Sequence, residues 1–93
     1  MTDAELLLVA LVDLVPGEAE AGARYEDEVL ALLPRHGGTL DRRLTTGDTE
    51  VQLISFKTRA GYASFMSDPD RLAIRARYGA AAPTARVLEV TER

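Results

Sequence analysis

The sequence predicts a single α+β domain in which helices lie against a four-stranded antiparallel sheet. Three observations indicate this fold. Residues 5–15 form a continuous apolar run, residues 18–33 carry apolar side chains at helical spacing, and residues 50–57 alternate as a strand before a second helical region. The chain has 93 residues, a usual length for one domain, so we expect residues 1–93 to fold as one unit.

The first strand is predicted from Glu5 to Val15, and its side chains are apolar on both faces. Such a run is typical of a central strand that is covered on both sides. Pro16 and Gly17 end this strand, and a helix is predicted from Glu18 to Leu33. The apolar stripe of the helix consists of Ala19, Gly22, Ala23, Val29, Leu30 and Leu33.

A predicted hairpin follows the first helix. Its strands run from Gly38 to Thr45 and from Glu50 to Lys57, and the turn between them is Thr46-Gly47-Asp48-Thr49. Simple alternation in the first of these strands puts Leu40, Arg42 and Leu44 on one face.

The last third of the chain is predicted to contain two helical segments and one strand. The segments are Arg59 to Met66 and Pro69 to Tyr78, with Thr58 and Asp68 as their caps. The last strand is predicted from Thr84 to Thr91. The resulting order, β-α-β-β-α-β, is the ferredoxin-like arrangement. Its uncovered sheet face is apolar, and we therefore expect a homodimer in which two such faces pack together.

Composition narrows the classes of partner. The net charge of −4 argues against nucleic acid and against an anionic membrane surface. The apolar run from Leu6 to Val15 is too short to span a bilayer and contains Asp13, and Met1 to Glu5 lack the basic residues of a signal peptide. There is no cysteine for a disulfide or a thiolate site. We expect a soluble, cytoplasmic protein, and the Ala- and Arg-rich composition suggests a GC-rich bacterial genome.

Three segments resemble a known group of proteins. They are Tyr25 to Gly38 (YEDEVLALLPRHGG), Leu53 to Phe56 (LISF) and Ser64 to Pro69 (SFMSDP), and they are similar to a family of unknown function in the dimeric α+β-barrel superfamily. Relatives in that superfamily include antibiotic-biosynthesis-type monooxygenases that need no cofactor, EthD-like and YCII-like proteins, and muconolactone isomerases. The resemblance implies a dimeric barrel with a small ligand held between sheet and helices. The monooxygenases hold polyphenolic substrates with Trp, His, Asn, Arg or Tyr, but this chain has no Trp and no Asn.

Glu26 is the least expected residue of the first helix, because it falls in the middle of the apolar stripe and Glu is rarely buried without a partner. In one interpretation the helix is rotated slightly and the carboxylate reaches water. In the other, Glu26 faces a cavity between helix and sheet, with Arg42 as its partner. A carboxylate in such a setting has opposing influences on its pKa and is a candidate for moving a proton.

His36 is the only histidine. It can act as a general base, since its pKa lies near neutrality, or it can interact with the last carbonyls of the preceding helix. One histidine without a neighbouring histidine or cysteine is not a metal site, so we expect no metal and no cofactor.

Arg42 and Tyr62 complete the candidate site. An inward Arg42 can hold a carboxylate or a phenolate, or it can pair with Glu50 or Glu89. Tyr62 can donate a hydrogen bond to a ligand, or it can fill the core with neighbouring apolar side chains. The run Arg71, Arg75 and Arg77 can attract an anion, but such runs are more often a solvated helix face.

Two hypotheses follow. In the first, the protein is a homodimeric barrel that binds a small phenolic or carboxylated metabolite. In the second, it is a cofactor-free monooxygenase or isomerase-like enzyme of aromatic or polyketide metabolism, in which Glu26 or His36 moves a proton and Arg42 and Tyr62 bind the ligand. The residues do not decide whether the protein is an enzyme.

Overall fold

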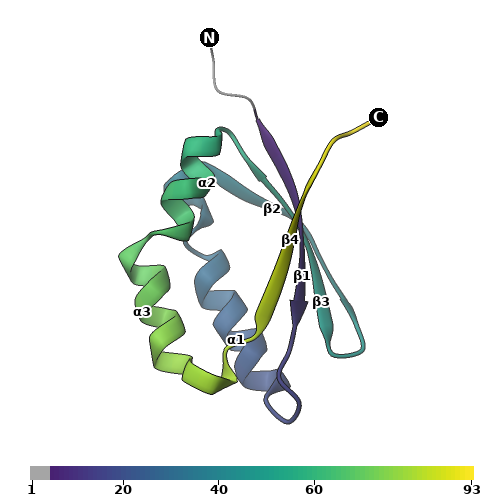
Figure 1. Ribbon diagram of the computed structural model, residues 1–93, viewed down its shortest axis with the longest axis vertical. Helices are drawn as coiled ribbons and strands as arrows, with labels where there is room; N and C mark the ends of the chain where they lie inside the picture. The colour runs from purple at the N-terminus through teal and green to yellow at the C-terminus, as the bar shows by residue number, and fades with distance from the viewer. Residues whose placement is uncertain (1–4) are drawn as a thin grey trace.

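A four-stranded antiparallel sheet carries all the helices of the described region on one of its faces (Figure 1). The computed structural model describes residues 5–93, so Met1 to Ala4, used above to argue against a signal peptide, lie outside it. In chain order the elements are β1 (Leu6–Asp13), α1 (Ala19–Leu30), η1 (Leu33–His36), β2 (Gly38–Thr46), β3 (Thr49–Phe56), α2 (Arg59–Met66), α3 (Pro69–Tyr78), η2 (Gly79–Ala81) and β4 (Thr84–Val90).

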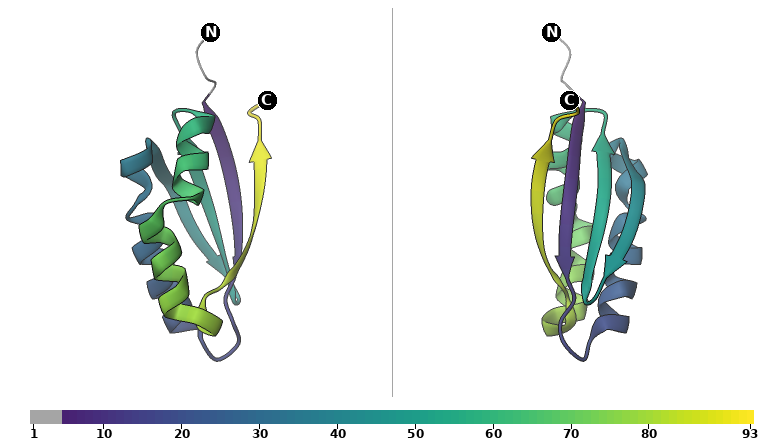
Figure 2. Two further views of the ribbon diagram at one scale, coloured as in Figure 1. Left: turned by 60° about the vertical axis from the view of Figure 1, so that its left-hand side comes forward. Right: turned by 90° about the vertical axis from the view of Figure 1, so that its right-hand side faces the viewer.

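The strand order is β2-β3-β1-β4, which places β1 in the centre of the sheet. Figure 2 shows the consequence: in its right-hand view the sheet faces the reader and the helices lie behind it. The predicted ferredoxin-like α+β fold with a four-stranded antiparallel sheet is therefore confirmed. Both edges of β1 are paired, as expected of a central strand, but in the single chain only one of its two apolar faces is buried.

The core lies between the sheet and the helices. Along β1 the residues Leu6, Leu8, Ala10 and Val12 are buried on the helix side. Helix α1 contributes Tyr25, Val29 and Leu30, and Phe56 and Phe65 join them from β3 and α2. Tyr25 was not part of the predicted stripe, which shows that α1 is rotated toward Tyr25 and away from Ala19, an exposed residue.

Helix α1 ends at Leu30, three residues before the predicted end. Residues 33–36 instead form the short 3₁₀ helix η1, with Pro34 in its first turn. Proline lacks the N–H that would continue the α-helical hydrogen bonds, so the chain tightens here. Gly37 follows with a φ of +72°, a conformation that suits glycine, and β2 begins at Gly38.

Strand β2 contains a β-bulge at Asp41. Leu40 is paired with Ile54, but the next pair in register is Arg42 with Leu53, so one residue is inserted between them. A bulge exchanges the faces of all residues beyond it. The prediction that Leu40, Arg42 and Leu44 share one face is therefore wrong: Leu40 points to the helices, whereas Arg42 and Leu44 point to the open face.

Caps begin the two C-terminal helices as the sequence predicts. The Thr58 side chain accepts a hydrogen bond from the Gly61 N–H, and the Asp68 side chain accepts one from the Asp70 N–H, with Pro69 at the first position of α3. Within residues 5–93, each helix is too short or too polar to cross a bilayer.

Candidate functional site

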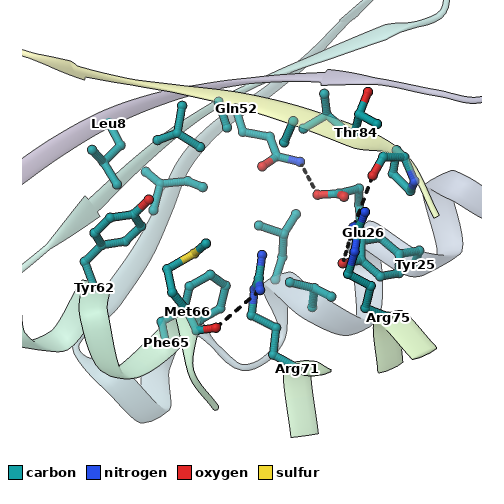
Figure 3. Close-up of a pocket in the computed structure, with 18 of the residues that line it drawn as sticks. Leu8, Tyr25, Glu26, Gln52, Tyr62, Phe65, Met66, Arg71, Arg75 and Thr84 are labelled. Carbon is teal, nitrogen blue, oxygen red and sulfur yellow. Dashed lines mark hydrogen bonds between the residues drawn. The ribbon is translucent and has the colours of Figure 1, made fainter. Parts of the chain in front are cut away.

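A cavity of about 460 Å³ lies between the helix-covered face of the sheet and the helices (Figure 3). Its volume is within the range of pockets that hold small organic ligands. Most of its walls are apolar, and the polar side chains are few. The lining residues are Leu8, Ala10, Val12, Tyr25, Glu26, Val29, Leu30, Gln52, Ile54, Phe56, Tyr62, Phe65, Met66, Arg71, Arg75, Pro83, Thr84, Ala85 and Val87.

The cavity opens along the edge strand β4. Val87 pairs with Ala10 and therefore points to the helix side of the sheet, yet it is 40% exposed. The neighbouring residue on that face, Ala85, is also exposed, although its partner in the register, Val12, is buried. Helices α2 and α3 thus leave this side of β4 uncovered, and a ligand can enter there.

Two contacts tie β4 to the helices at the ends of this opening. Arg59 of α2 donates to the Glu89 carboxylate at 3.2 Å, and Arg75 of α3 donates to the Pro83 carbonyl at 3.3 Å. The opening between them is bordered by the Met66 side chain, which is itself exposed. The two contacts therefore connect β4 to the helices at both ends of the opening, and the side chain that borders the opening between them is apolar.

Glu26 lies on the cavity wall and is only 7% exposed. The amide of Gln52 on β3 donates a hydrogen bond to Glu26 Oε1 at 2.8 Å, shown as a dashed line in Figure 3. Burial raises the pKa of Glu26 above its ordinary value; the Gln52 hydrogen bond opposes this change, and the nearby charge of Glu50 adds to it. Of the two interpretations of Glu26 from the sequence, the geometry is that of the buried one.

A second buried carboxylate lies behind Gln52. The same Gln52 nitrogen donates to Glu50 Oε1 at 2.9 Å, so one amide bridges two carboxylates. Arg43 Nε donates to Glu50 Oε1 at 2.5 Å, and Arg43 also pairs with Asp27. Glu50 is therefore neutralised by an arginine, whereas Glu26 is held by an amide alone and keeps its second oxygen without a hydrogen bond in the described residues.

Arg42 does not take part in this network. The bulge at Asp41 puts Arg42 on the open face of the sheet, opposite Leu53, and it puts Arg43 opposite Gln52 on the helix side. The predicted pairing of Arg42 with Glu26 is therefore wrong: Arg42 lies on the other face, and the arginine on the helix side, Arg43, pairs with Glu50 and Asp27. A bulge leaves little signal in a single sequence, because polar and apolar residues already mix in this strand.

Tyr62 lines the far end of the cavity. Tyr62 is on α2, and its ring centre lies 5.4 Å from that of Phe56; the ring of Phe65, also on α2, lies 5.7 Å from Phe56. The aromatic rings pack on one another, so Tyr62 both fills the core and borders the cavity (Figure 3).

His36 lies outside the cavity lining. Its Nδ1 is 2.9 Å from Ser64 Oγ, and its Nε2 is 2.7 Å from Asp68 Oδ2. Gly61 allows η1 and α2 to lie this close together, because a Cβ at position 61 would lie 2.3 Å from the His36 carbonyl oxygen. His36 therefore joins η1 to the junction between α2 and α3.

The side chains of Ser64, His36 and Asp68 form a chain of hydrogen bonds. Asp68 also makes contacts that stabilise the fold. It accepts from Arg35 at 3.0 Å and caps α3 through the Asp70 N–H at 2.8 Å. The hydrogen bond from His36 is the main reason why the pKa of Asp68 is lowered, and Arg35 adds to it. This cluster fastens η1 to the break between the two helices.

Two arginines of α3 line the cavity, although their run suggests a solvated helix face. Arg71 and Arg75 are four residues apart and lie on one side of the helix, whereas Arg77 points outward and pairs with Glu28. The sequence feature that could have indicated their inward position is the spacing of four residues between Arg71 and Arg75, together with the small residue Ala85 on β4, the strand that these two arginines approach. Within residues 5–93, no group of three or more acidic, histidine or cysteine side chains is arranged to hold a metal.

The fold is shared with solved structures of several bacterial proteins. Rv0793 from Mycobacterium tuberculosis superposes with a TM-score of 0.74 at 16% identity, covering 97% of this chain and 98% of that one. SnoaB, a cofactor-independent oxygenase from Streptomyces nogalater, gives a TM-score of 0.67 at 19% identity, with 97% and 94% covered. An uncharacterized NIPSNAP domain protein from Burkholderia xenovorans gives 0.72 at 14% identity, with 95% and 94% covered.

These similarities establish the class of fold. The chain shares its ferredoxin-like α+β architecture with these proteins. No family profile matches the sequence, and no curated protein is similar to it.

Replacement of Glu26 by Gln is expected to raise thermal stability, and more so at higher pH. Because the folded-state pKa of Glu26 is raised above 4.5, the wild-type protein loses stability as the pH rises through that pKa. Gln keeps an acceptor for the Gln52 amide and carries no charge. Thermal unfolding across pH 4 to 8 checks this: the advantage of the variant should be smallest below pH 4.5. A variant that is less stable at pH 8 would show that Glu26 is part of a stabilising ion pair.

Replacement of Asp68 by Asn is expected to have the opposite pH dependence. The pKa of Asp68 is lowered in the folded state, so its carboxylate stabilises the protein above the ordinary value of 3.8, and this contribution is lost as the pH falls through the lowered pKa. Asp68→Asn should melt at a lower temperature than wild type near neutral pH, with the difference shrinking below pH 3.8. Asp70→Asn, which loses only an exposed contact with Arg35, is the control and should shift less.

Proposed function

We propose that the protein is a homodimer that binds a small phenolic or carboxylated metabolite in the cavity between helices and sheet. The observation that carries this proposal is the cavity itself, with a volume of about 460 Å³ and a direct opening along β4. Apolar walls with a few directed polar groups are the usual composition of a small-molecule site. The end of the cavity at Tyr62 carries no charge, and it suits the flat apolar ring system of such a ligand.

Polar recognition is proposed to occur at Glu26 and Gln52. A ligand hydroxyl can donate to the Glu26 oxygen that has no hydrogen bond, and the Gln52 carbonyl oxygen points toward the cavity in Figure 3. Both groups are buried, so a hydrogen bond to either is formed in a place where water competes little. Of the residues predicted from the sequence, Glu26 and Tyr62 keep a place in this proposal, whereas His36 and Arg42 lie elsewhere.

Dimerisation is supported by the open face of the sheet. Val9 in the centre of β1 has Leu53 and Leu88 as its neighbours in the register, and Leu44 and Leu88 are 47% and 36% exposed in the single chain. An apolar patch that crosses four strands is larger than isolated surface residues require. A second copy that presents the same face covers it, with the two sheets packed about 10 Å apart.

The alternative is a cofactor-free enzyme, a monooxygenase or an isomerase-like catalyst. The observation that favours it is the raised pKa of Glu26 on the cavity wall, because a carboxylate with such a pKa is a better proton acceptor. An isomerase moves one proton within its substrate and uses a group of this kind. His36 does not line the cavity, so Glu26 is the residue that this alternative would use.

Ligand binding can be tested with 2-naphthol and 2-naphthoate, which share an apolar body, by isothermal titration calorimetry. Ala85→Phe places a ring in the opening and should weaken both by about tenfold or more, which corresponds to about 1.4 kcal/mol. Ala63→Phe, on the exposed side of α2 and outside the lining, is the matched control and should bind as wild type does. Failure of both compounds to bind the wild-type protein would overturn the proposed function.

The dimer can be tested by sedimentation equilibrium at micromolar concentration. Val9→Asp introduces an unpaired charge into the proposed interface and should weaken association by about 3 kcal/mol or more. Leu72 is 51% exposed on α3, away from the open face, so Leu72→Asp should remain dimeric. A monomer mass for the wild-type protein would contradict the proposal.

A further inference from the structure

Arg71 is an arginine whose charge is not paired by the chain. It rises from α3 into the cavity, and its Nε–H is buried with no hydrogen-bond partner among the described residues. Figure 3 shows the guanidinium directed into the cavity from the helix side, across from Gln52. A buried donor without a partner lowers stability, and in a native protein it calls for an explanation.

Five other arginines of the described chain have carboxylate partners, and the four others that form no ion pair there, Arg42, Arg75, Arg86 and Arg93, are exposed. Arg24, Arg35, Arg43, Arg59 and Arg77 each form an ion pair. Arg71 forms no ion pair within residues 5–93, although it is half-buried. Its electrostatic influence reaches Glu26, but only as a minor contribution to the pKa of that residue. The positive charge in the cavity is thus left for something that the chain does not supply.

The orientation of Arg71 is fixed by its surroundings. Its Cζ lies 5.3 Å from the centre of the Phe65 ring, and NH1 donates a long hydrogen bond of 3.4 Å to the Met66 carbonyl. Stacking on an aromatic ring preserves the in-plane N–H groups of a guanidinium for other partners. Arg75, in contrast, is exposed at the rim, where its NH1 donates to the Pro83 carbonyl and the Tyr25 hydroxyl.

We propose that Arg71 is the anion receptor of the cavity and that the ligand is an aromatic acid with a single negative charge. The acidic group of the ligand meets the terminal nitrogens of the Arg71 guanidinium, and its ring lies between Phe65 and the apolar wall formed by Leu8 and Ile54. This inference rests on the proposed function, and it assigns the charge class of the ligand. It also gives a role to a residue that the sequence pattern assigns to solvent.

The cavity wall opposite Arg71, which contains Glu26, limits the number of negative charges on the ligand. Glu26 is a carboxylate held by a neutral amide, so a second anionic group placed beside it would be repelled. A hydroxyl placed there donates a hydrogen bond instead. The preferred ligand is therefore a hydroxylated aromatic monoacid, and a diacid of the same shape is disfavoured.

The test compares four compounds on one ring system: 2-naphthoate, its neutral analogue 2-naphthamide, 6-hydroxy-2-naphthoate and the dianion 2,6-naphthalenedicarboxylate. Isothermal titration calorimetry at pH 7 measures each Kd. The wild-type protein should bind naphthoate about tenfold more tightly than naphthamide, as expected for a hydrogen bond to a charged group. The hydroxylated acid should bind more tightly than naphthoate, and the dianion more weakly.

Arg71→Gln should remove the preference for naphthoate over naphthamide while changing the naphthamide Kd less than about threefold. Arg71→Lys keeps the charge without the planar fork and should give an intermediate preference. Arg77→Gln, on the same helix but facing outward, should leave both affinities unchanged. Thermal melts of all three variants check that the comparison is made on folded protein.

The outcomes separate the two proposals. If naphthoate and naphthamide bind the wild-type protein with equal affinity, the anion-receptor inference is overturned. It is also overturned if Arg71→Gln keeps the wild-type preference for naphthoate. In either case the proposal of a ligand cavity still holds. If a dianion binds as tightly as the hydroxylated monoacid, the assignment of a single charge is overturned. If none of the compounds binds, the cavity proposal fails and the inference fails with it.

Discussion

The central position of β1 is the constraint on which the other features depend. With β3 on one edge and β4 on the other, its side chains have two faces to cover, but the helices cover only one. The helix side takes Leu6, Leu8, Ala10 and Val12 into the core. On the other side Leu7, Val9 and Leu11 remain partly exposed in the single chain. Removal of such apolar area from water is the main source of association free energy, and this is the basis of the proposed dimer.

The cavity results from how the helices meet that sheet. Thr58 begins α2, and Asp68 and Pro69 end it and begin α3, so the helical layer is broken in two instead of running straight along β4. The His36–Asp68 contact fixes this break against η1. The helices consequently leave the β4 side open, and the interior keeps a space that close packing would otherwise fill. In this view His36 supports the site from outside.

Polar groups inside the cavity are arranged around Gln52. Its amide donates to Glu26 and Glu50, and Arg43 satisfies the second of these carboxylates. Charged groups are costly to remove from water, and groups with a perturbed pKa in a cleft are candidates for a functional site. Arg71 and Arg75 line the cavity from α3. The cavity is thus divided into an acidic wall at Glu26 and a basic wall at α3.

The sequence by itself determined the fold: the doubly apolar first strand, the helical stripe, the hairpin and the capped helices all depend on local spacing, and local spacing is read directly from the chain. It also identified Glu26, because a carboxylate within an apolar stripe is conspicuous. Only the tertiary structure decided the partners. The bulge at Asp41 put Arg43 instead of Arg42 on the helix side, since one inserted residue reverses the faces of a strand without changing its composition, and Glu26 is paired with Gln52. The contact of His36 with Asp68 spans 32 residues, and the inward direction of Arg71 depends on where α3 sits over the sheet; neither is encoded in neighbouring residues.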